Sequence, residues 1–302
     1  MLKKILLTGS NGLLGQKIID QLRYHTEYEL IASSKGENRY PKEGGYIYEN
    51  LDVCNPLELE RIAAKYEPYA IIHTAAMTNV DQCETEREQC DRLNVDAVQY
   101  LIDVCKKRAI YLVHLSTDFV FDGKKGMYEE TDAPNPLSYY GSSKLKAEEL
   151  LLNSSIDYSI LRTIIVYGLA AKMSRSNIVL WAKSALEKGD KIKVVNDQFR
   201  MPTLAEDLAD ACVKAVDKRA KGIYHVSGKD YMSVIEMVRR IAKHYGLNEG
   251  LIEETNSGTL NQAAVRPPNT GFKIDKAIKE LGYAPHSFEE GLDIVRKQLE
   301  KK

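Results

Sequence analysis

Two side chains four positions apart are the first in this sequence that could transfer a proton. Tyr140 and Lys144 stand in the run Tyr-Gly-Ser-Ser-Lys, and residues at i and i+4 of a helix share a face. An ammonium beside a phenol favours the phenolate and lowers the pKa of the phenol, so Tyr140 would donate and accept a proton near neutral pH. The same spacing also occurs by chance, and the alternative interpretation is an exposed helix that carries a tyrosine.

A hydroxyl that could bind a carbonyl oxygen lies further back in the chain. Thr117 stands at the carboxyl end of an apolar run, in the sequence Ser-Thr-Asp. A hydroxyl at the end of a strand can donate a hydrogen bond to a substrate carbonyl. Thr117, Tyr140 and Lys144 are therefore the candidate catalytic residues.

Three glycines near the amino terminus indicate a dinucleotide site. They are spaced G-x-x-G-x-x-G between the first expected strand and the first expected helix. Glycine permits a tight turn and lets a pyrophosphate approach backbone N–H groups at the positive end of a helix. A glycine-rich turn without a ligand is the alternative. The candidate cofactor contacts of this turn are Gly9, Asn11, Gly12, Leu13, Leu14 and Gly15.

The end of the second expected strand favours NADP(H). A domain that binds NAD usually places an acidic residue there for the ribose hydroxyls, but this chain has Ser33, Ser34 and Lys35. Two hydroxyls and a cation suit a 2′-phosphate, so NADP(H) is the expected cofactor and NAD(H) remains possible. Glu37 and Arg39 lie nearby, and a solvated polar loop is the alternative interpretation.

Composition favours a soluble, cytoplasmic protein with a small-molecule partner. The 302 residues carry a formal net charge of -1, which gives no electrostatic footprint for nucleic acid or a membrane surface. No apolar stretch reaches the roughly 18 residues of a membrane span, and the short first run is expected to be a strand rather than a signal peptide. Five cysteines without a C-x-x-C pair suit a reducing compartment. The six histidines include no H-x-x-x-H pair, so no catalytic metal is expected.

Alternating strand and helix patterns predict the scaffold of these residues. Apolar strands are expected at 5–8, 30–33, 70–74, 111–116 and 158–166, and helices lie between them, the longest at about 90–108 and 140–152. Buried parallel strands covered by helices on both faces are typical of such alternation. The fold class is therefore α/β, a Rossmann-type doubly wound parallel sheet with a smaller α/β substrate-binding domain. The cofactor domain is expected to comprise 1–167 and about 194–222, and the substrate domain about 168–193 and 223–302.

Taken together, the chain resembles the extended short-chain dehydrogenase/reductases, and among them the dTDP-4-dehydrorhamnose reductase group. The resemblance runs through nearly the whole sequence and rests on ordered motifs as well as single residues. These motifs are the glycine turn at 9–15, LDV at 51–53, AAMTNVD at 75–81 with Glu84, NVDA at 94–97, STDFVFDG at 116–123, PL at 136–137, YGSSK at 140–144, LRT at 161–163, VYG at 166–168, NDQ at 196–198, PT at 202–203, DLA at 207–209 and RP at 266–267.

The resemblance implies a role for each matching residue. Thr117, Tyr140 and Lys144 would be catalytic, with hydride going to the C4 keto carbon of a nucleotide-linked sugar while Tyr140 protonates the oxygen. Related dehydratases carry an Asp-Glu pair after the strand-end threonine, where this chain has Asp118 and Phe119, so dehydration is disfavoured. The further cofactor contacts would be Asp52 and Val53 on the adenine side, Ala75, Ala76 and Thr78 at a strand end, and Tyr140 and Lys144.

Two departures from the reductase pattern bear on the substrate. Ile165 stands where a tryptophan usually packs on the sugar, and Arg200 stands where a glycine is usual. Arg266 could bind phosphate oxygens through two parallel hydrogen bonds, although ordering its own loop is an alternative. The candidate substrate contacts are Thr117, Asp118, Val120, Ile165, Asn177 and Arg266.

Two other functions remain open. One is reduction or 4-epimerisation of another 4-keto sugar nucleotide. The other is a non-catalytic, NADP-binding regulatory subunit like that of methionine adenosyltransferase, although intact Thr117, Tyr140 and Lys144 favour an enzyme. A nucleotide sugar is the expected partner, and a homodimer is possible.

Overall fold

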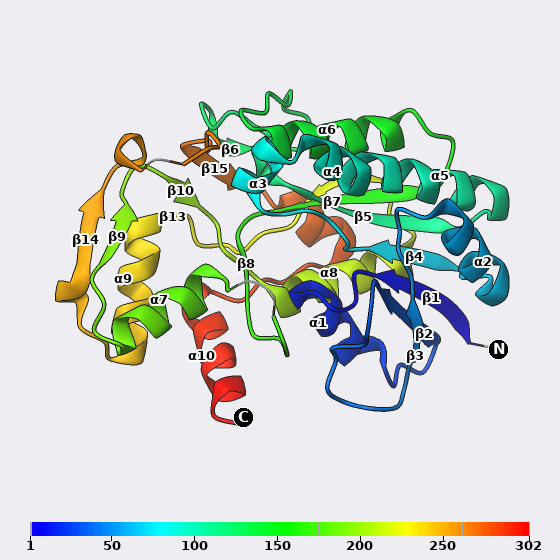
Figure 1. Cartoon of the computed structure of the whole chain (residues 1–302), viewed down its shortest axis with the longest axis horizontal. Helices are drawn as coiled ribbons and strands as arrows, with labels where there is room; N and C mark the ends of the chain where they lie inside the picture. Colours follow the sequence, from blue (N-terminus) through cyan, green and yellow to red (C-terminus); the bar gives the residue numbers. More distant parts are fainter. Residues whose placement is uncertain (1, 174–175, 261, 302) are drawn as a thin grey trace.

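The computed structural model describes residues 2–173, 176–260 and 262–301, and its centre is a seven-stranded parallel sheet (Figure 1). The strand order is β3-β2-β1-β4-β5-β7-β12, and every neighbouring pair is parallel. This is the expected α/β, Rossmann-type doubly wound sheet. The strands are β1 (Lys3–Thr8), β2 (Tyr28–Ser34), β3 (Ile47–Asn50), β4 (Ala70–His73), β5 (Tyr111–Thr117), β7 (Tyr158–Thr163) and β12 (Gly222–His225).

Helices cover both faces of the large sheet. On one face, α1 (Leu13–Leu22) and α8 (Ala205–Lys218) contribute buried apolar residues such as Ile18 and Leu208. The other face is covered by α2 (Pro56–Tyr66), α5 (Ala97–Arg108) and α6 (Tyr139–Leu152), with Leu59, Leu101 and Leu151 in the core. Because both faces are buried, the strands are almost continuously apolar, as a parallel sheet requires.

Short helical pieces precede α5 and pack against the start of α6. They are α3 (Val80–Thr85), α4 (Arg87–Asp91) and a π-helical turn (Arg92–Asp96). The π turn interrupts the long helix that the sequence predicts over 90–108. Such single turns widen a helix locally and are frequent near functional sites.

A smaller part of the molecule lies beside the carboxyl end of the large sheet (Figure 1). Its separate core includes buried residues of α7 (Ile178–Glu187), α9 (Val234–Tyr245) and α10 (Phe288–Leu299). One two-stranded sheet pairs β9 (Ile192–Val195) with β14 (Ile252–Thr255), and another pairs β8 (Val166–Tyr167) with β11 (Thr203–Leu204). The four-stranded sheet has the order β13 (Met232–Ser233), β10 (Phe199–Arg200), β15 (Asn269–Phe272) and β6 (Gly126–Tyr128).

Strand pairing differs from the expected domain limits at two places. The limit at 222 falls inside β12, which pairs with β7 in the large sheet, and β9 at 192–195 pairs with β14 rather than with the large sheet. Both strands are four residues long, too short for their partner to be identified from pattern. The division into a cofactor and a substrate domain stays a prediction. Its segments include residues 1, 174, 175, 261 and 302, which lie outside the described residues.

Candidate active site

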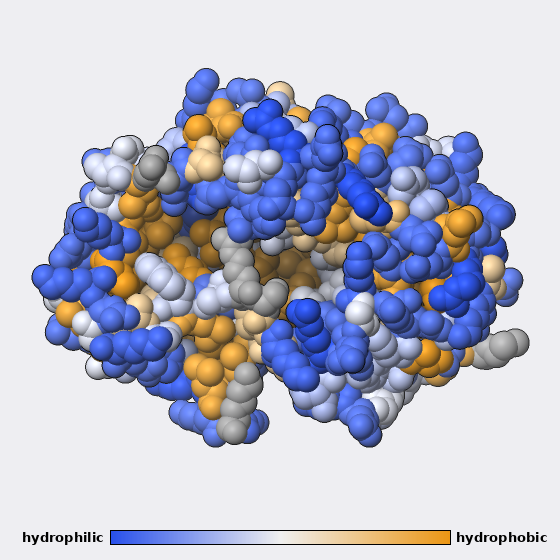
Figure 2. Space-filling view, viewed as in Figure 1, coloured by the Kyte–Doolittle hydropathy of each residue, from blue (hydrophilic) through white to orange (hydrophobic). Residues whose placement is uncertain are grey.

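The carboxyl ends of the parallel strands bring the candidate residues to one edge of the large sheet. The strand order reverses between β1 and β4, and crevices at such reversals bind ligands in doubly wound sheets. The glycine turn follows β1, Ala75 and Ala76 follow β4, and Thr117 ends β5. The molecular surface is hollowed near the centre of the same view, with apolar side chains at the bottom of the hollow (Figure 2).

Close packing requires glycine at two of the three positions of the turn, and the third glycine is exposed. A Cβ on Gly9, whose φ is +75°, would lie 2.6 Å from the backbone nitrogen of Ala75. A Cβ on Gly15 would lie 2.4 Å from the carbonyl oxygen of Gly9, so Gly15 lets the turn close on itself and Gly9 lets it approach the segment after β4. At Gly12 the nearest atom would be 3.3 Å away, and Gly12 is the N-cap of α1 without a side chain to cap it.

The start of α1 therefore suits an anion. Its first turn, which includes Leu13 and Leu14, carries no acidic residue, and Gly12 leaves room for close backbone approach. Helix N-termini of this kind bind phosphate through backbone N–H groups and the helix dipole. The residues present thus fit the pyrophosphate of a dinucleotide.

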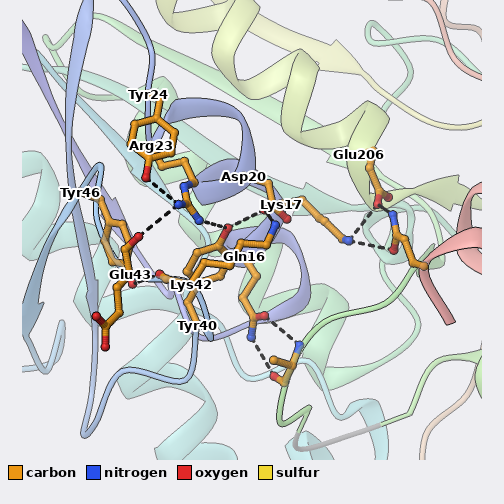
Figure 3. Close-up of polar contacts among 12 residues, drawn as sticks. Gln16, Lys17, Asp20, Arg23, Tyr24, Tyr40, Lys42, Glu43, Tyr46 and Glu206 are labelled. Carbon is orange, nitrogen blue, oxygen red and sulfur yellow. Dashed lines mark hydrogen bonds and ion pairs between the residues drawn. The ribbon is translucent and has the colours of Figure 1, made fainter. Parts of the chain in front are cut away.

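Side chains of α1 form hydrogen bonds with two neighbouring loops (Figure 3). Gln16 accepts a hydrogen bond from the backbone nitrogen of Ala171 and donates to its carbonyl, each at 2.9 Å. On the other side Asp20 accepts from Tyr40 at 2.5 Å and from Lys42 at 2.7 Å. Gln16 thus holds the first part of α1, and Asp20 holds its last turn.

A close contact between α6 and the end of β5 brings Tyr140 to Thr117. Ser138 caps α6 by accepting from the backbone nitrogen of Gly141 at 3.2 Å. A Cβ on Gly141 would lie only 2.2 Å from the carbonyl oxygen of Phe119, so this contact requires glycine. The ring of Phe119 packs edge-on against Tyr140 at 5.8 Å between centroids. Gly141 belongs to the motif at 140–144, but the sequence alone predicts no role for it.

Burial shifts the pKa values of two candidate catalytic groups, Tyr140 and Lys144. Tyr140 is 8% exposed, and burial raises the pKa of its phenol while a hydrogen bond with Thr117 opposes the rise. Burial lowers the pKa of Lys144 to about 8, and the nearby Glu148 carboxylate opposes that shift. Burial thus opposes the expected depression of the Tyr140 pKa, because desolvation disfavours both charged forms.

Asn94 is a residue of this region that sequence reasoning left without a role. From the π turn its side-chain oxygen accepts from the backbone nitrogen of Met77 at 2.8 Å, and its nitrogen donates to the Ser143 hydroxyl at 3.0 Å. Ser143 in turn donates to the carbonyl of Tyr140 at 2.8 Å. Asn94 thus ties the loop after β4 to the catalytic helix.

The residues expected to bind a 2′-phosphate lie in different environments. Ser33 is fully buried and its hydroxyl donates to the carbonyl of Leu7 at 2.9 Å, so its side chain is withdrawn from any ligand. Lys35 is exposed and pairs with Asp52 at 2.8 Å. Asn11 accepts from the backbone nitrogen of Arg39 at 2.8 Å, which brings this second exposed cation next to the glycine turn.

The remaining candidate cofactor contacts differ in their exposure to solvent. Asp52 and Val53 follow β3, where Asp52 is partly exposed and Val53 is largely buried. Ala75 and Ala76 are partly exposed and Thr78 is exposed. These positions can border a bound dinucleotide, whereas Val53 is 6% exposed and mainly supports the loop.

Asp118 forms a buried charged cluster rather than an open contact. It accepts hydrogen bonds from Thr117 at 3.1 Å and from Thr270 at 2.5 Å, and its carboxylate lies 3.6 Å from Nε of Arg200. The Arg200 guanidinium also donates to the carbonyl of Pro267 at 2.6 Å. Burial raises the pKa of Asp118, and Arg200 opposes that rise. The departure at position 200 thus places a cation directly behind the catalytic strand end.

Val120, which the resemblance predicts as a substrate contact, has a buried side chain. Its side chain is fully buried in the core on the α1 face of the sheet. The short 3-10 turn that contains it (Asp118–Val120) directs Val120 inward because β5 ends there.

Ile165 and Asn177 lie at the join between the two parts. Ile165 packs against both cores and has a φ of 34°, a left-handed conformation that is rare for a β-branched residue. Asn177 caps α7 and donates to the carbonyl of Gly168 at 2.7 Å. Both residues fix the segment that follows β7, and strained backbone of this kind often occurs at ligand sites.

The expected phosphate contact of Arg266 is already engaged by a carboxylate. Arg266 donates to both oxygens of Asp81, at 3.2 and 2.6 Å, and Asp81 also accepts from the backbone nitrogen of Ala264 at 3.0 Å. This bidentate pair ties the loop before β15 to α3. The guanidinium of Arg266 is therefore directed at Asp81.

The sheet order, the glycine turn and the Thr117, Tyr140 and Lys144 arrangement define a Rossmann-type, extended short-chain dehydrogenase/reductase. More narrowly, the chain belongs to the family described as the RmlD substrate binding domain, whose model matches residues 3–301. The family and its structural neighbours are NAD(P)-dependent oxidoreductases. In the ranges that the structure describes, none of the helices has both the length and the apolar character that crossing a membrane requires.

Relatives in this family carry different names. A probable low-salt glycan biosynthesis reductase of Haloferax volcanii is 31% identical over 95% of this chain and 95% of its own. A dTDP-4-dehydrorhamnose reductase of Aggregatibacter actinomycetemcomitans is 30% identical over 98% and 99%. A methionine adenosyltransferase 2 subunit beta of Bos taurus is 28% identical over 93% and 83%.

Solved structures agree with the fold. A dTDP-4-dehydrorhamnose reductase of Clostridium acetobutylicum matches with a TM-score of 0.86 at 27% identity, covering 98% of this chain and 99% of that one. A second, from Bacillus anthracis in complex with NADP, matches with a TM-score of 0.85 at 27% identity, covering 99% and 100%.

Proposed function

We propose that the protein uses NAD(P)H to reduce the C4 keto group of a nucleotide-linked 6-deoxy sugar, as a dTDP-4-dehydrorhamnose reductase does. The observation that carries the proposal is the close contact between the start of α6, which carries Tyr140, and the turn after Thr117, at the sheet edge that holds the glycine turn. Lys144 lies one turn along the same helix. Such a trio suits addition of a hydride and a proton to a carbonyl group.

The chain's own residues account for binding and proton transfer. Gly9, Gly12 and Gly15 would hold the pyrophosphate, and a bound dihydronicotinamide would supply the hydride. Tyr140 would donate its proton to the carbonyl oxygen, and Lys144 would stabilise the resulting phenolate. Burial of both groups strengthens this electrostatic support, because charges interact more strongly where water is excluded.

The experiment is an assay of the purified protein with NADPH and NADH against a panel of 4-keto-6-deoxy sugar nucleotides. We expect cofactor oxidation with a dTDP-linked 4-keto sugar and a product reduced at C4. The variant Lys144→Met should lose cofactor oxidation while its circular dichroism spectrum stays unchanged. That result would assign the activity to this site. Binding of NADPH with no turnover of any sugar would instead favour a regulatory role like that of the methionine adenosyltransferase subunit.

NADPH preference is a separate part of the proposal, supported by the exposed cations Lys35 and Arg39 near the glycine turn. Lys35→Asp should weaken NADPH binding by about tenfold and favour NADH, because an anion repels the 2′-phosphate and accepts from ribose hydroxyls. Fluorescence titration with both cofactors measures the change. Equal affinity for NADPH and NADH in the wild type, unchanged in the variant, would contradict it.

A further inference from the structure

Polar side chains form a buried row across the sheet beneath the catalytic helix. Thr8 of β1, His73 of β4 and His114 of β5 are register partners on neighbouring strands. They are at most 2% exposed. Apolar residues such as Ile71 and Leu112 occupy the previous row on the same face. Polar residues therefore replace the apolar core from this row towards the active-site edge, and the next row contains the buried Ser116 and Arg162.

The row ends on the catalytic lysine. Nζ of Lys144 lies 3.2 Å from Nε2 of His114, the rings of His114 and His73 stack with centroids 5.5 Å apart, and Nδ1 of His73 lies 2.7 Å from the Thr8 hydroxyl. An ammonium can only donate, so Nε2 of His114 accepts and the ring proton of His114 belongs on Nδ1. The lysine thus has a directional partner on the side of the sheet.

Both histidines are held neutral. Burial lowers the pKa of His73 to about 3, and burial together with Lys144 and His73 keeps the pKa of His114 well below its ordinary value. The other titratable groups that face Lys144 are Glu148 and Cys90. Glu148, however, is already bound by Arg162 at 2.6 Å. A neutral imidazole consequently supplies the hydrogen bond to the ammonium.

The arrangement is costly for stability. Among the described residues, Nδ1 of His114 and Nε2 of His73 are buried without a hydrogen-bond partner. An unsatisfied buried polar atom costs free energy, and apolar side chains of similar shape would avoid that cost. Two such rings, packed next to a row of apolar residues, indicate a role other than packing.

We propose that His114, supported by His73 and Thr8, is a positioning residue that holds the buried Lys144 side chain in its protonated form beside Tyr140. Its catalytic meaning rests on the proposed reductase function. A hydrogen bond to the charged form favours that form. This counteracts the burial that lowers the pKa of Lys144 to about 8.

The sign of the effect is testable by the pH dependence of kcat/KM. Removing the acceptor disfavours the ammonium, so the pKa of Lys144 should fall further. The loss of activity on raising the pH should then begin at a lower pH. His114→Leu should move the alkaline limb down by about one pH unit or more, the loss of one charge-assisted hydrogen bond. His114→Gln, which keeps a neutral acceptor, should restore part of the shift.

A matched control comes from another buried histidine of the same sheet. His225 in β12 is also fully buried with a pKa lowered to about 3, but it stacks on Phe272 and contacts Arg162. His225→Gln should leave the alkaline limb in place. A drop in His114→Leu that is equal at every pH, or a similar shift in His225→Gln, would overturn the proposal.

A second measurement does not depend on turnover. In protein labelled with ¹⁵N at its six histidines, the His114 ring should show the Nδ1–H tautomer and stay neutral on acidification. Its nitrogen shifts should instead change near pH 8, as Lys144 loses its proton, and Lys144→Met should abolish that change. An Nε2–H tautomer, or a midpoint near 6.5, would overturn the proposal even if the sugar substrate were still unidentified.

Discussion

At the scale of single residues, the site differs from the sequence interpretation mainly through burial and pairing. Thr117 ends a strand, and Tyr140 and Lys144 share a helix, as the motif predicts, but burial raises the pKa of Tyr140. Ser33 and Val120 are withdrawn into the core, because the alternation of a strand or the end of a turn decides which way a side chain points. A motif gives residue identity, whereas direction depends on the packed elements.

Tyr140→Phe should lower turnover on the order of 100-fold, because the proton donor is lost while the ring and its packing on Phe119 remain. Cofactor affinity should stay within a few-fold. The neighbouring Tyr139→Phe is the control, since the Tyr139 hydroxyl donates to Asp91 at 2.7 Å and lies away from Thr117. Steady-state kinetics and NADPH titration measure both. An inactive Tyr139→Phe with a fully active Tyr140→Phe would refute the assignment.

Arg200→Gly should destabilise the protein although glycine is usual at this position in the reductases it resembles. Removing the guanidinium leaves Asp118 as an unpaired buried carboxylate and frees the carbonyl of Pro267. Breaking a buried pair in this way costs about 3–5 kcal/mol. Denaturant unfolding measures the loss. Adding Asp118→Asn should recover part of it, and equal stability of the single and double variants would argue against the pairing.

At the scale of elements, regular alternation was predictable and irregular pairing was not. The long β-α repeats give the strands of the large sheet, because continuous apolar runs and helical periodicity are strong signals. Strands β10 and β13 have two residues each and are defined by their partners across the sheet. The hydrogen bond between Asn94 and Met77 and the pairing of His73 with His114 likewise depend on which elements become neighbours, which the sequence pattern does not show.

Gly141→Ala should separate α6 from the end of β5. The added Cβ would lie 2.2 Å from the carbonyl oxygen of Phe119, so the helix must shift and carry Tyr140 with it. We expect a loss of about 1–3 kcal/mol in unfolding free energy and at least about a tenfold fall in kcat. Ser142→Ala, in the same helical turn, is the control and removes only a hydrogen bond to Ser138. Equal effects of both substitutions would contradict the role of the close contact, because alanine favours a helix more than glycine or serine does.

At the scale of the whole molecule, the Asp81 and Arg266 pair joins segments 185 residues apart in sequence. Arg200 holds the carbonyls of Pro267 and Pro268 from the other side, so the loop at 264–268 is fixed to α3 and to β10 at once. This loop therefore connects the smaller part of the molecule with α3. It lies near the edge of the large sheet where we propose that the sugar nucleotide binds.

We predict that Arg266 acts on the substrate through this connection. Arg266→Gln and Asp81→Asn should each raise KM for the sugar nucleotide by about tenfold, with a smaller effect on kcat, because either change releases the loop. The double variant should be no worse than the more severe single variant, since residues in one contact give non-additive effects. Direct binding of the diphosphate by Arg266 makes the opposite prediction. Asp81→Asn would then free the guanidinium and tighten substrate binding, while Arg266→Gln alone would weaken it.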